Sequence, residues 1–94
     1  MLTLRQIEVI RAIMVTGTVG GAARLLNVSS PGISRIMKPA ELSVGVKLFN
    51  RRGGRYIPTR EANSIFDQIN SVYDKVEDLQ FVISRIKRGA NTKI

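Results

Sequence analysis

The chain has 94 residues, a length that suits one compact domain. It contains no cysteine and no histidine, which excludes disulfides, thiolate metal sites and the commonest general base of enzymes. No apolar run approaches the roughly 20 residues of a membrane-spanning helix, and the N-terminal stretch carries too many charges for a secretory leader. We therefore expect a cytoplasmic protein with no membrane partner.

The net charge of +8 is distributed unevenly along the chain. Residues 1–60 hold ten cations and two anions, whereas residues 61–94 hold five of each. A charge confined to one half of a chain favours a half that faces a polyanion, joined to a neutral half with another task.

Two helices are predicted near the N-terminus from their capping residues. Thr3 and Gln6 have the spacing of a capping box, so the first helix should begin near residue 4. Gly17 is suited to end that helix, and Thr18 is suited to cap the second one.

The stretch "NVSSPGISRIMK" predicts a third helix. Ser29 or Ser30 can cap it, and Pro31 fits its first turn, where a missing N–H costs nothing. Two short helices joined by a tight turn are typical of a helix-turn-helix. An apolar stripe along this helix indicates the buried face: Ile33, Met37, Ala40 and Val44.

The opposite face of the third helix has the chemistry of a nucleic-acid contact. A helix N-terminus offers free N–H groups and partial positive charge to phosphate. Ser29, Ser30 and Ser34 are short donors, Lys38 is a cation, and Arg35 can make a bidentate contact to guanine. This pattern favours a helix that enters the major groove. Taken alone, it also fits a capped surface helix with solvated cations.

After Gly45 the pattern changes to a basic hairpin. Two short strands are predicted around the turn at residues 52–55, one at Val46 and Leu48 and one at Tyr56 and Ile57. Three arginines flank its glycine tip: Arg51, Arg52 and Arg55. A thin loop of this kind suits contact with the DNA backbone or the minor groove. We therefore predict a winged helix-turn-helix domain over residues 1–58.

A long helix is predicted over residues 59–89, capped by Thr59 and ended by Gly89, with residues 90–94 as a disordered tail. Its apolar residues alternate at spacings of three and four, which is a heptad seam. We expect this seam to form a dimer interface through Ile65, Ile69, Val72, Val76, Leu79, Ile83 and Ile86. The alternative is an amphipathic helix that packs on its own domain.

Residues 2–60 resemble the N-terminal DNA-binding domain of LysR-type transcriptional regulators. The matching pieces are "LRQIEVIRAI", "TVGGAARLLNVSSPGISR", the "E…VGVKLFNR" run from Glu41 to Arg51, and "PTREA". Residues 61–88 match the linker helix of that family. The resemblance implies a homodimer through antiparallel linker helices, a recognition helix at about residues 30–43 and a wing at about residues 46–58. It also implies a small-molecule inducer only through a domain that is absent from this chain.

The resemblance implies DNA contacts by the start of the recognition helix and by the wing: Ser30, Pro31, Ser34, Arg35, Lys38, Arg51, Arg52 and Arg55. Ser30 stands where the family often has Gln. Pro39 falls inside the predicted recognition helix, where it either kinks the helix or is a variant.

We predict a mainly α fold: a winged helix-turn-helix with a small β-hairpin wing and a long C-terminal linker or dimerisation helix. The predicted function is sequence-specific binding of a double-stranded promoter operator as a homodimer. We predict no enzyme activity, cofactor or metal, because the seven carboxylates are scattered. One alternative is a coiled-coil self-association module with an incidental basic surface. A single-strand or RNA binder is disfavoured, because aromatic residues are only 5% of the chain and provide no stacking platform.

Overall fold

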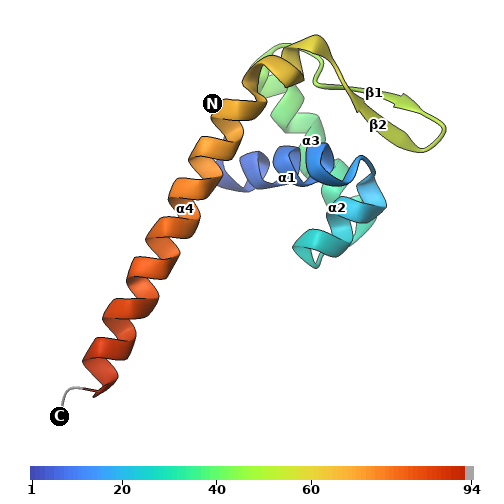
Figure 1. Ribbon diagram of the computed structural model, residues 1–94. Coiled ribbons are helices and arrows are strands. Elements are labelled where there is room, and N and C mark those ends of the chain that lie inside the picture. The colour runs from blue at the N-terminus through green and yellow to red at the C-terminus, as the bar shows by residue number, and fades with distance from the viewer. Residues whose placement is uncertain (93–94) are drawn as a thin grey trace.

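The computed structural model of the protein describes residues 1–92. Its elements are α1 (Leu4–Thr16), α2 (Val19–Leu26), α3 (Ser30–Val44), β1 (Phe49–Arg52), β2 (Arg55–Pro58) and α4 (Arg60–Thr92). Helices α1 to α3 form a compact group, the hairpin projects from it, and α4 extends away on another side (Figure 1). The predicted mainly helical fold with a hairpin wing is thus confirmed.

The predicted capping residues set the helix boundaries. The Thr3 hydroxyl accepts a hydrogen bond from the Gln6 N–H at 3.1 Å, and the Gln6 side chain accepts one from the Thr3 N–H at 3.0 Å. Gly17 ends α1 with a φ of +80°, and the Thr18 hydroxyl caps α2 by accepting from the Gly21 N–H. These local interactions explain why α1 and α2 begin where the sequence predicts.

The core lies where α1, α2 and α3 meet, and the base of the hairpin closes it. The largest fully buried side chains are Val9, Ile10, Ile13, Ile33 and Leu48. The predicted apolar stripe of α3 faces this core: three of its residues are buried and Val44 is partly buried. The opposite face of α3 is therefore held toward solvent.

Strands β1 and β2 form an antiparallel hairpin whose register pairs Phe49 with Pro58 and Arg52 with Arg55. Gly53 and Gly54 make the two-residue turn with φ values of +55° and +77°, a left-handed conformation that glycine adopts without strain.

The first strand begins later than predicted. Val46 and Leu48 precede it, because the Glu41 carboxylate accepts the Leu48 N–H and the Thr59 N–H donates to the Leu48 carbonyl. Those two hydrogen bonds occupy the backbone N–H and carbonyl of Leu48, so the pairing between β1 and β2 starts at Phe49.

Helix α3 continues without a break through Pro39. Proline has no N–H to donate to the carbonyl four residues earlier, which here belongs to Arg35. Both residues are exposed, so water can hydrogen-bond to that carbonyl. The helix therefore accommodates the proline on its solvent side and ends only at Gly45, which has a φ of +83°.

Helix α4 starts as predicted and ends later. The Thr59 hydroxyl accepts from the Ala62 N–H at 3.2 Å, which confirms the cap. The helix passes through Gly89 to Thr92, so the prediction that Gly89 ends it is wrong, as is the predicted tail at residues 90–92. Gly89 does not adopt the left-handed conformation of a C-cap, and an interior glycine costs only about 1 kcal/mol. The rest of the predicted tail, residues 93–94, lies outside the described residues.

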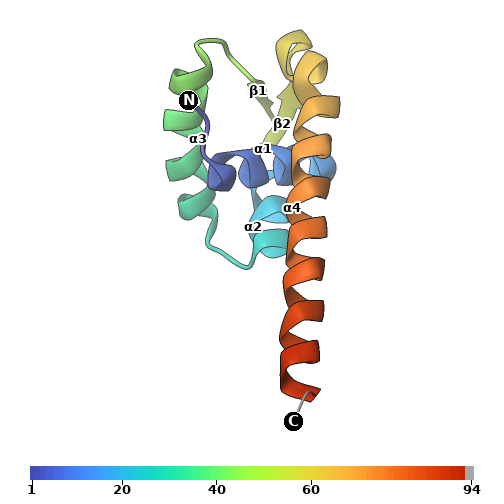
Figure 2. The same cartoon turned by 90° about the vertical axis from the view of Figure 1, so that its left-hand side faces the viewer.

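The heptad seam of α4 divides into two parts. In the proximal half (residues 60–76), Ala62 is fully buried and Ile69 is only 5% exposed, both against their own domain. In the distal half (residues 77–92), Leu79 is 57% exposed and Ile86 is 65% exposed. Figure 2 shows α1 crossing toward the proximal half, whereas the distal half extends beyond the domain.

A polar contact holds the proximal half of α4 to α1. The Arg11 guanidinium lies 4.0 Å from the centre of the Tyr73 ring, and its Nε donates to the Asn70 amide oxygen at 3.2 Å. Among the described residues, no helix combines the length and apolar character needed to cross a membrane.

Candidate nucleic-acid interface

The N-terminus of α3 is exposed and capped by Ser29. The Ser29 hydroxyl accepts from the Gly32 N–H at 3.1 Å, so this serine is the cap and Ser30 is the first helical residue. Ser30 and Pro31 are both exposed at the start of the helix. The hydroxyls of both serines can still donate outward, next to the free N–H groups of the first turn.

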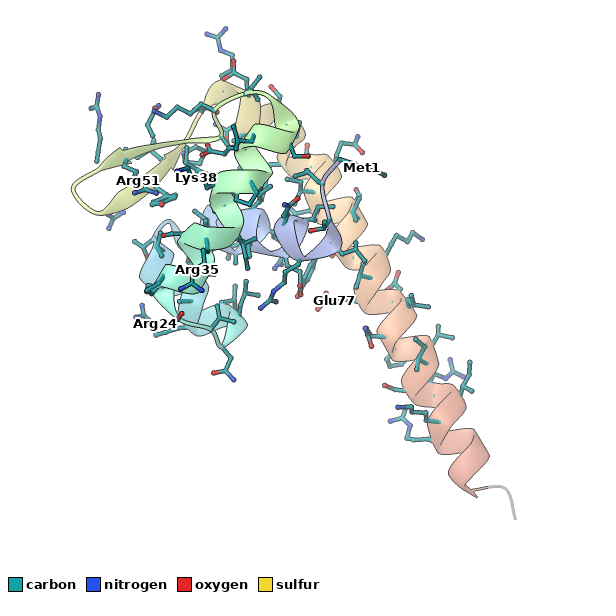
Figure 3. The ribbon with its side chains drawn as sticks, turned by 180° about the vertical axis from the view of Figure 1, so that it is seen from behind. Met1, Arg24, Arg35, Lys38, Arg51 and Glu77 are labelled. Atoms are coloured by element: carbon teal, nitrogen blue, oxygen red, sulfur yellow. The ribbon has the colours of Figure 1, made fainter. Side chains whose placement is uncertain are left out.

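The outer face of α3 presents two exposed cations and one hydroxyl. Arg35 and Lys38 are exposed and Ser34 is half-buried, while Ile33 and Met37 on the other side are in the core. Figure 3 shows Arg35 and Lys38 along this outer face, with Arg24 on the neighbouring helix α2. Arg24 is exposed and was not among the predicted site residues; its position in α2, ahead of the turn, gave no motif signal.

The wing carries its three predicted arginines in exposed positions. Arg52 and Arg55 are direct partners in the strand register, beside the glycine turn. Like charges directly opposite one another destabilise a strand pair. An anion bound at the tip would relieve that repulsion, so the wing is electrostatically suited to a polyanion.

A groove of about 350 Å³ separates α3 from the wing. It is lined by Ser34, Met37, Lys38, Glu41, Phe49, Arg51 and Tyr56. Arg51 reaches into this region from β1, with its guanidinium 4.8 Å from the centre of the Tyr56 ring. The groove therefore brings together three of the predicted residues, Ser34 and Lys38 of α3 and Arg51 of the wing.

Glu41 positions the wing against α3. Its carboxylate accepts the N–H groups of Leu48 at 2.6 Å and Phe49 at 3.2 Å, which ties the start of β1 to the helix. In the sequence Glu41 is one of two anions in the basic half, and it begins the run up to Arg51 that resembles the family. The scarcity of acids was the available signal, because one of only two acids among ten cations needs a structural reason.

The cations of this surface have no acidic partners. The salt bridge found among residues 1–92 joins Arg5 to Glu8, on α1. Arg35, Lys38, Arg51, Arg52 and Arg55 therefore present uncompensated charge on α3 and the wing. The same described part of the chain contains no cluster of acidic side chains that could hold a metal ion.

The predicted dimer residues are not all available to a partner. Ile69 is buried by its own domain and presents almost no surface to a partner, and Ile65 and Val76 are half-buried. The other four predicted residues are exposed: Val72, Leu79, Ile83 and Ile86. Val82 was not predicted; it is exposed and adjoins the seam.

A three-helix core, an exposed basic face on its third helix and a basic hairpin wing define a winged helix-turn-helix DNA-binding domain. Residues 4–63 match the family described as "Bacterial regulatory helix-turn-helix protein, lysR family". The chain belongs to this family, which consists of transcriptional regulators and not enzymes. The resemblance noted from the sequence is therefore confirmed.

A curated relative illustrates this membership, and two solved structures have the same fold. The chain is 40% identical over 86 residues to the HTH-type transcriptional regulator DgcR from a Pseudoalteromonas species, covering 92% of this chain and 30% of that protein. The chain thus spans about a third of the length of the curated relatives it matches.

Two of the similar structures contain DNA. Full-length CbnR, complexed with its target DNA, has 25% identity and a TM-score of 0.77, covering 89% of this chain and 29% of that one. The BenM DNA-binding domain with catB site 1 DNA has a TM-score of 0.78, covering 94% of this chain and 95% of that one. At 22% identity the BenM comparison shows the shared fold alone.

Proposed function

We propose that the chain binds double-stranded promoter DNA sequence-specifically, as a homodimer, with α3 in the major groove and the wing along the backbone or minor groove. The observation that carries the proposal is the set of uncompensated cations on α3 and the wing, two of which, Lys38 and Arg51, line the groove between these elements. The major groove of B-DNA admits an α-helix, and a two-stranded hairpin such as the wing is thin enough to contact the minor groove. Such a regulator would act in the cytoplasm, where the bacterial chromosome lies.

We assign base contacts to the first turns of α3 and mainly backbone contacts to the wing. Ser30, Pro31, Arg35 and Lys38 are exposed and Ser34 is half-buried, all of them outside the buried stripe, so they are accessible to a duplex that α3 docks against. Ser29 contributes the cap and a neighbouring hydroxyl. Arg51, Arg52 and Arg55 lie on the hairpin, where several arginines near a flexible tip suit phosphate contacts.

The proposed homodimer uses the exposed apolar residues of α4, all but one of which lie in the distal half. A helix with an exposed apolar stripe in water is covered in the active state by another surface. A second copy, packed antiparallel through Val72, Leu79, Val82, Ile83 and Ile86, would cover this stripe. The two DNA-binding domains of one dimer would then contact two half-sites.

The experiment separates base contacts from phosphate contacts. A preferred duplex is first selected from a random library with the wild-type chain. Arg35→Ala and Arg52→Ala are then titrated against this duplex and a scrambled one at several salt concentrations. Arg35→Ala should lose about 1–3 kcal/mol on the selected duplex only. Arg52→Ala should weaken both duplexes in parallel and lower the salt slope by roughly one.

Two results would contradict the proposal. Equal weakening of both duplexes by Arg35→Ala would make Arg35 a backbone contact and remove α3 as the reading element. A wild-type chain that sediments as a dimer but ignores duplex would favour the alternative, a coiled-coil module whose basic surface is incidental.

A further inference from the structure

Tyr56 combines deep burial with an unused hydroxyl group. Its side chain is only 8% exposed, on β2, and its ring packs against the Phe49 ring with centroids 5.7 Å apart. Its hydroxyl oxygen is buried and has no hydrogen-bond partner among the described residues. A phenylalanine would give the same ring packing without burying an unpaired hydroxyl, which costs free energy. Packing alone therefore does not explain the hydroxyl.

The surroundings of Tyr56 indicate what could accept a hydrogen bond from it. Tyr56 lines the groove between α3 and the wing together with Ser34, Lys38 and Arg51. Figure 3 shows Lys38 and Arg51 reaching into the gap between α3 and the wing, one from each side. Two cations beside a hydroxyl donor suit an anionic oxygen. The Glu41 carboxylate also lines the groove, but it already accepts the N–H groups of Leu48 and Phe49. In the proposed complex with DNA, the oxygen anion that comes to this groove from outside is a backbone phosphate.

We propose that the Tyr56 hydroxyl donates a hydrogen bond to a DNA backbone phosphate that binds in this groove between Lys38 and Arg51. The inference rests on the proposed DNA binding and adds a neutral contact to it. Arg51 stacks on the Tyr56 ring in the free chain. When the phosphate attracts the Arg51 guanidinium, this long side chain moves off the ring and exposes the hydroxyl.

A neutral donor has a signature that a cation does not have. Removing a lysine or arginine from a phosphate contact lowers both the affinity and its salt dependence, because fewer counterions are released. Removing a hydroxyl lowers the affinity but leaves the salt slope unchanged. The loss should be equal on all sequences, because every duplex has the same phosphates.

The test compares Tyr56→Phe with Tyr73→Phe, a matched loss of one hydroxyl on α4, where Tyr73 stacks with Arg11. Free Tyr56→Phe should melt at or above the wild-type temperature, because it loses an unpaired buried hydroxyl. It should bind the selected and scrambled duplexes roughly fivefold to tenfold more weakly than wild type. Its salt slope should equal that of wild type, and Tyr73→Phe should bind as wild type does.

Duplexes with single methylphosphonate substitutions locate the contact. Wild type should lose affinity at one phosphate where Tyr56→Phe loses less, so the two changes are not additive. Unchanged binding by Tyr56→Phe, a loss confined to one base pair, or a destabilised free Tyr56→Phe chain would each overturn the inference. A wild-type chain that binds no duplex at all would instead overturn the proposed function.

Discussion

The two halves of α4 have the same apolar period and different surroundings. In the proximal half, Ala62 and Ile69 are buried against their own domain; in the distal half, Leu79 and Ile86 are exposed. The heptad pattern continues without a polar break across the boundary. A heptad spacing of apolar residues therefore predicts a helix with an apolar stripe, but it does not predict which surface covers each part of that stripe.

The two halves also differ in what stabilises them as helix. The proximal half packs on the core and on α1, so its helical state is part of the domain's folding. Within residues 1–92 the distal half extends beyond the packed elements (Figure 2), and only its first turn adjoins α1, where Gln80 lines a pocket with Leu4 and Ile7. An isolated helical segment of this length is marginal in water. Dimerisation and helix formation in the distal half are therefore expected to be one coupled process.

The largest effect is expected from a charge placed in the proximal half. Ile69→Lys puts an unpaired ammonium among buried side chains, which should cost several kcal/mol of the roughly 5–15 kcal/mol that stabilise a small domain. Thermal melting followed by circular dichroism should show an unfolded or severely destabilised chain. Ile86→Lys, the same change in the distal half, should leave the melting of the domain unchanged. Equal melting of the two variants would mean that the proximal half does not depend on its contacts with the domain.

The second effect concerns dimerisation. Leu79→Lys should give a folded monomer in sedimentation equilibrium, because it places a charge at the centre of the exposed stripe. A monomer has only one DNA-binding domain, so its binding to a duplex with two half-sites should be weaker by about 100-fold. Ser84→Lys adds the same charge to an exposed position off the seam and should remain dimeric. If Leu79→Lys stays dimeric at the same concentration as Ser84→Lys, the distal stripe is not the interface.

Sequence alone predicted the features that depend on local chemistry. The caps at Thr3, Thr18 and Thr59 and the Gly53-Gly54 turn each involve residues within four positions of one another. The outer face of α3 followed from helical periodicity, because the buried stripe determines the opposite face.

Features that depend on long-range packing were not predictable in this way. The Glu41 carboxylate binds N–H groups seven and eight residues away, which delays β1. The contact between Arg11 and Asn70 joins residues 59 positions apart, and it determines which part of the seam is covered. The wrongly predicted end of α4 at Gly89 has a different cause. A glycine is compatible with a C-cap but does not require one.

The third prediction concerns the contact at the boundary between the halves. Arg11→Ala removes the hydrogen bond to Asn70 and the stacking on Tyr73, so it should destabilise the domain by about 1–2 kcal/mol. It should also make the angle between α4 and α1 more variable. That angle sets the orientation of the DNA-binding domain relative to the proposed dimerisation helix. Duplexes with half-sites at different spacings should therefore be bound with less discrimination than by wild type. Arg5→Ala, which removes an exposed ion pair on α1, should change stability by at most about 0.5 kcal/mol and keep the spacing preference.

The smallest effect is expected near the end of the distal half, where Gly89 lies inside the helix. Gly89→Ala should stabilise the helical state by up to about 1 kcal/mol, and an added Cβ meets no other atom within 4 Å. Because the distal half folds with the dimer and both protomers carry the change, this gain should raise helicity and tighten dimerisation by up to about 30-fold. The melting of the domain should not change.

Gly45→Ala is the matched control for this substitution. Gly45 has a φ of +83° at the C-cap of α3, where a side chain is strained, so the same change should destabilise the domain by about 1 kcal/mol. The two glycines therefore predict opposite signs from one substitution. If Gly89→Ala instead lowers helicity, Gly89 must be a left-handed C-cap in solution, and α4 would end there. The distal half would then lose residues 89–92, and its last seam residue, Ile86, would lie in the final helical turn, where fraying weakens its contribution to the dimer.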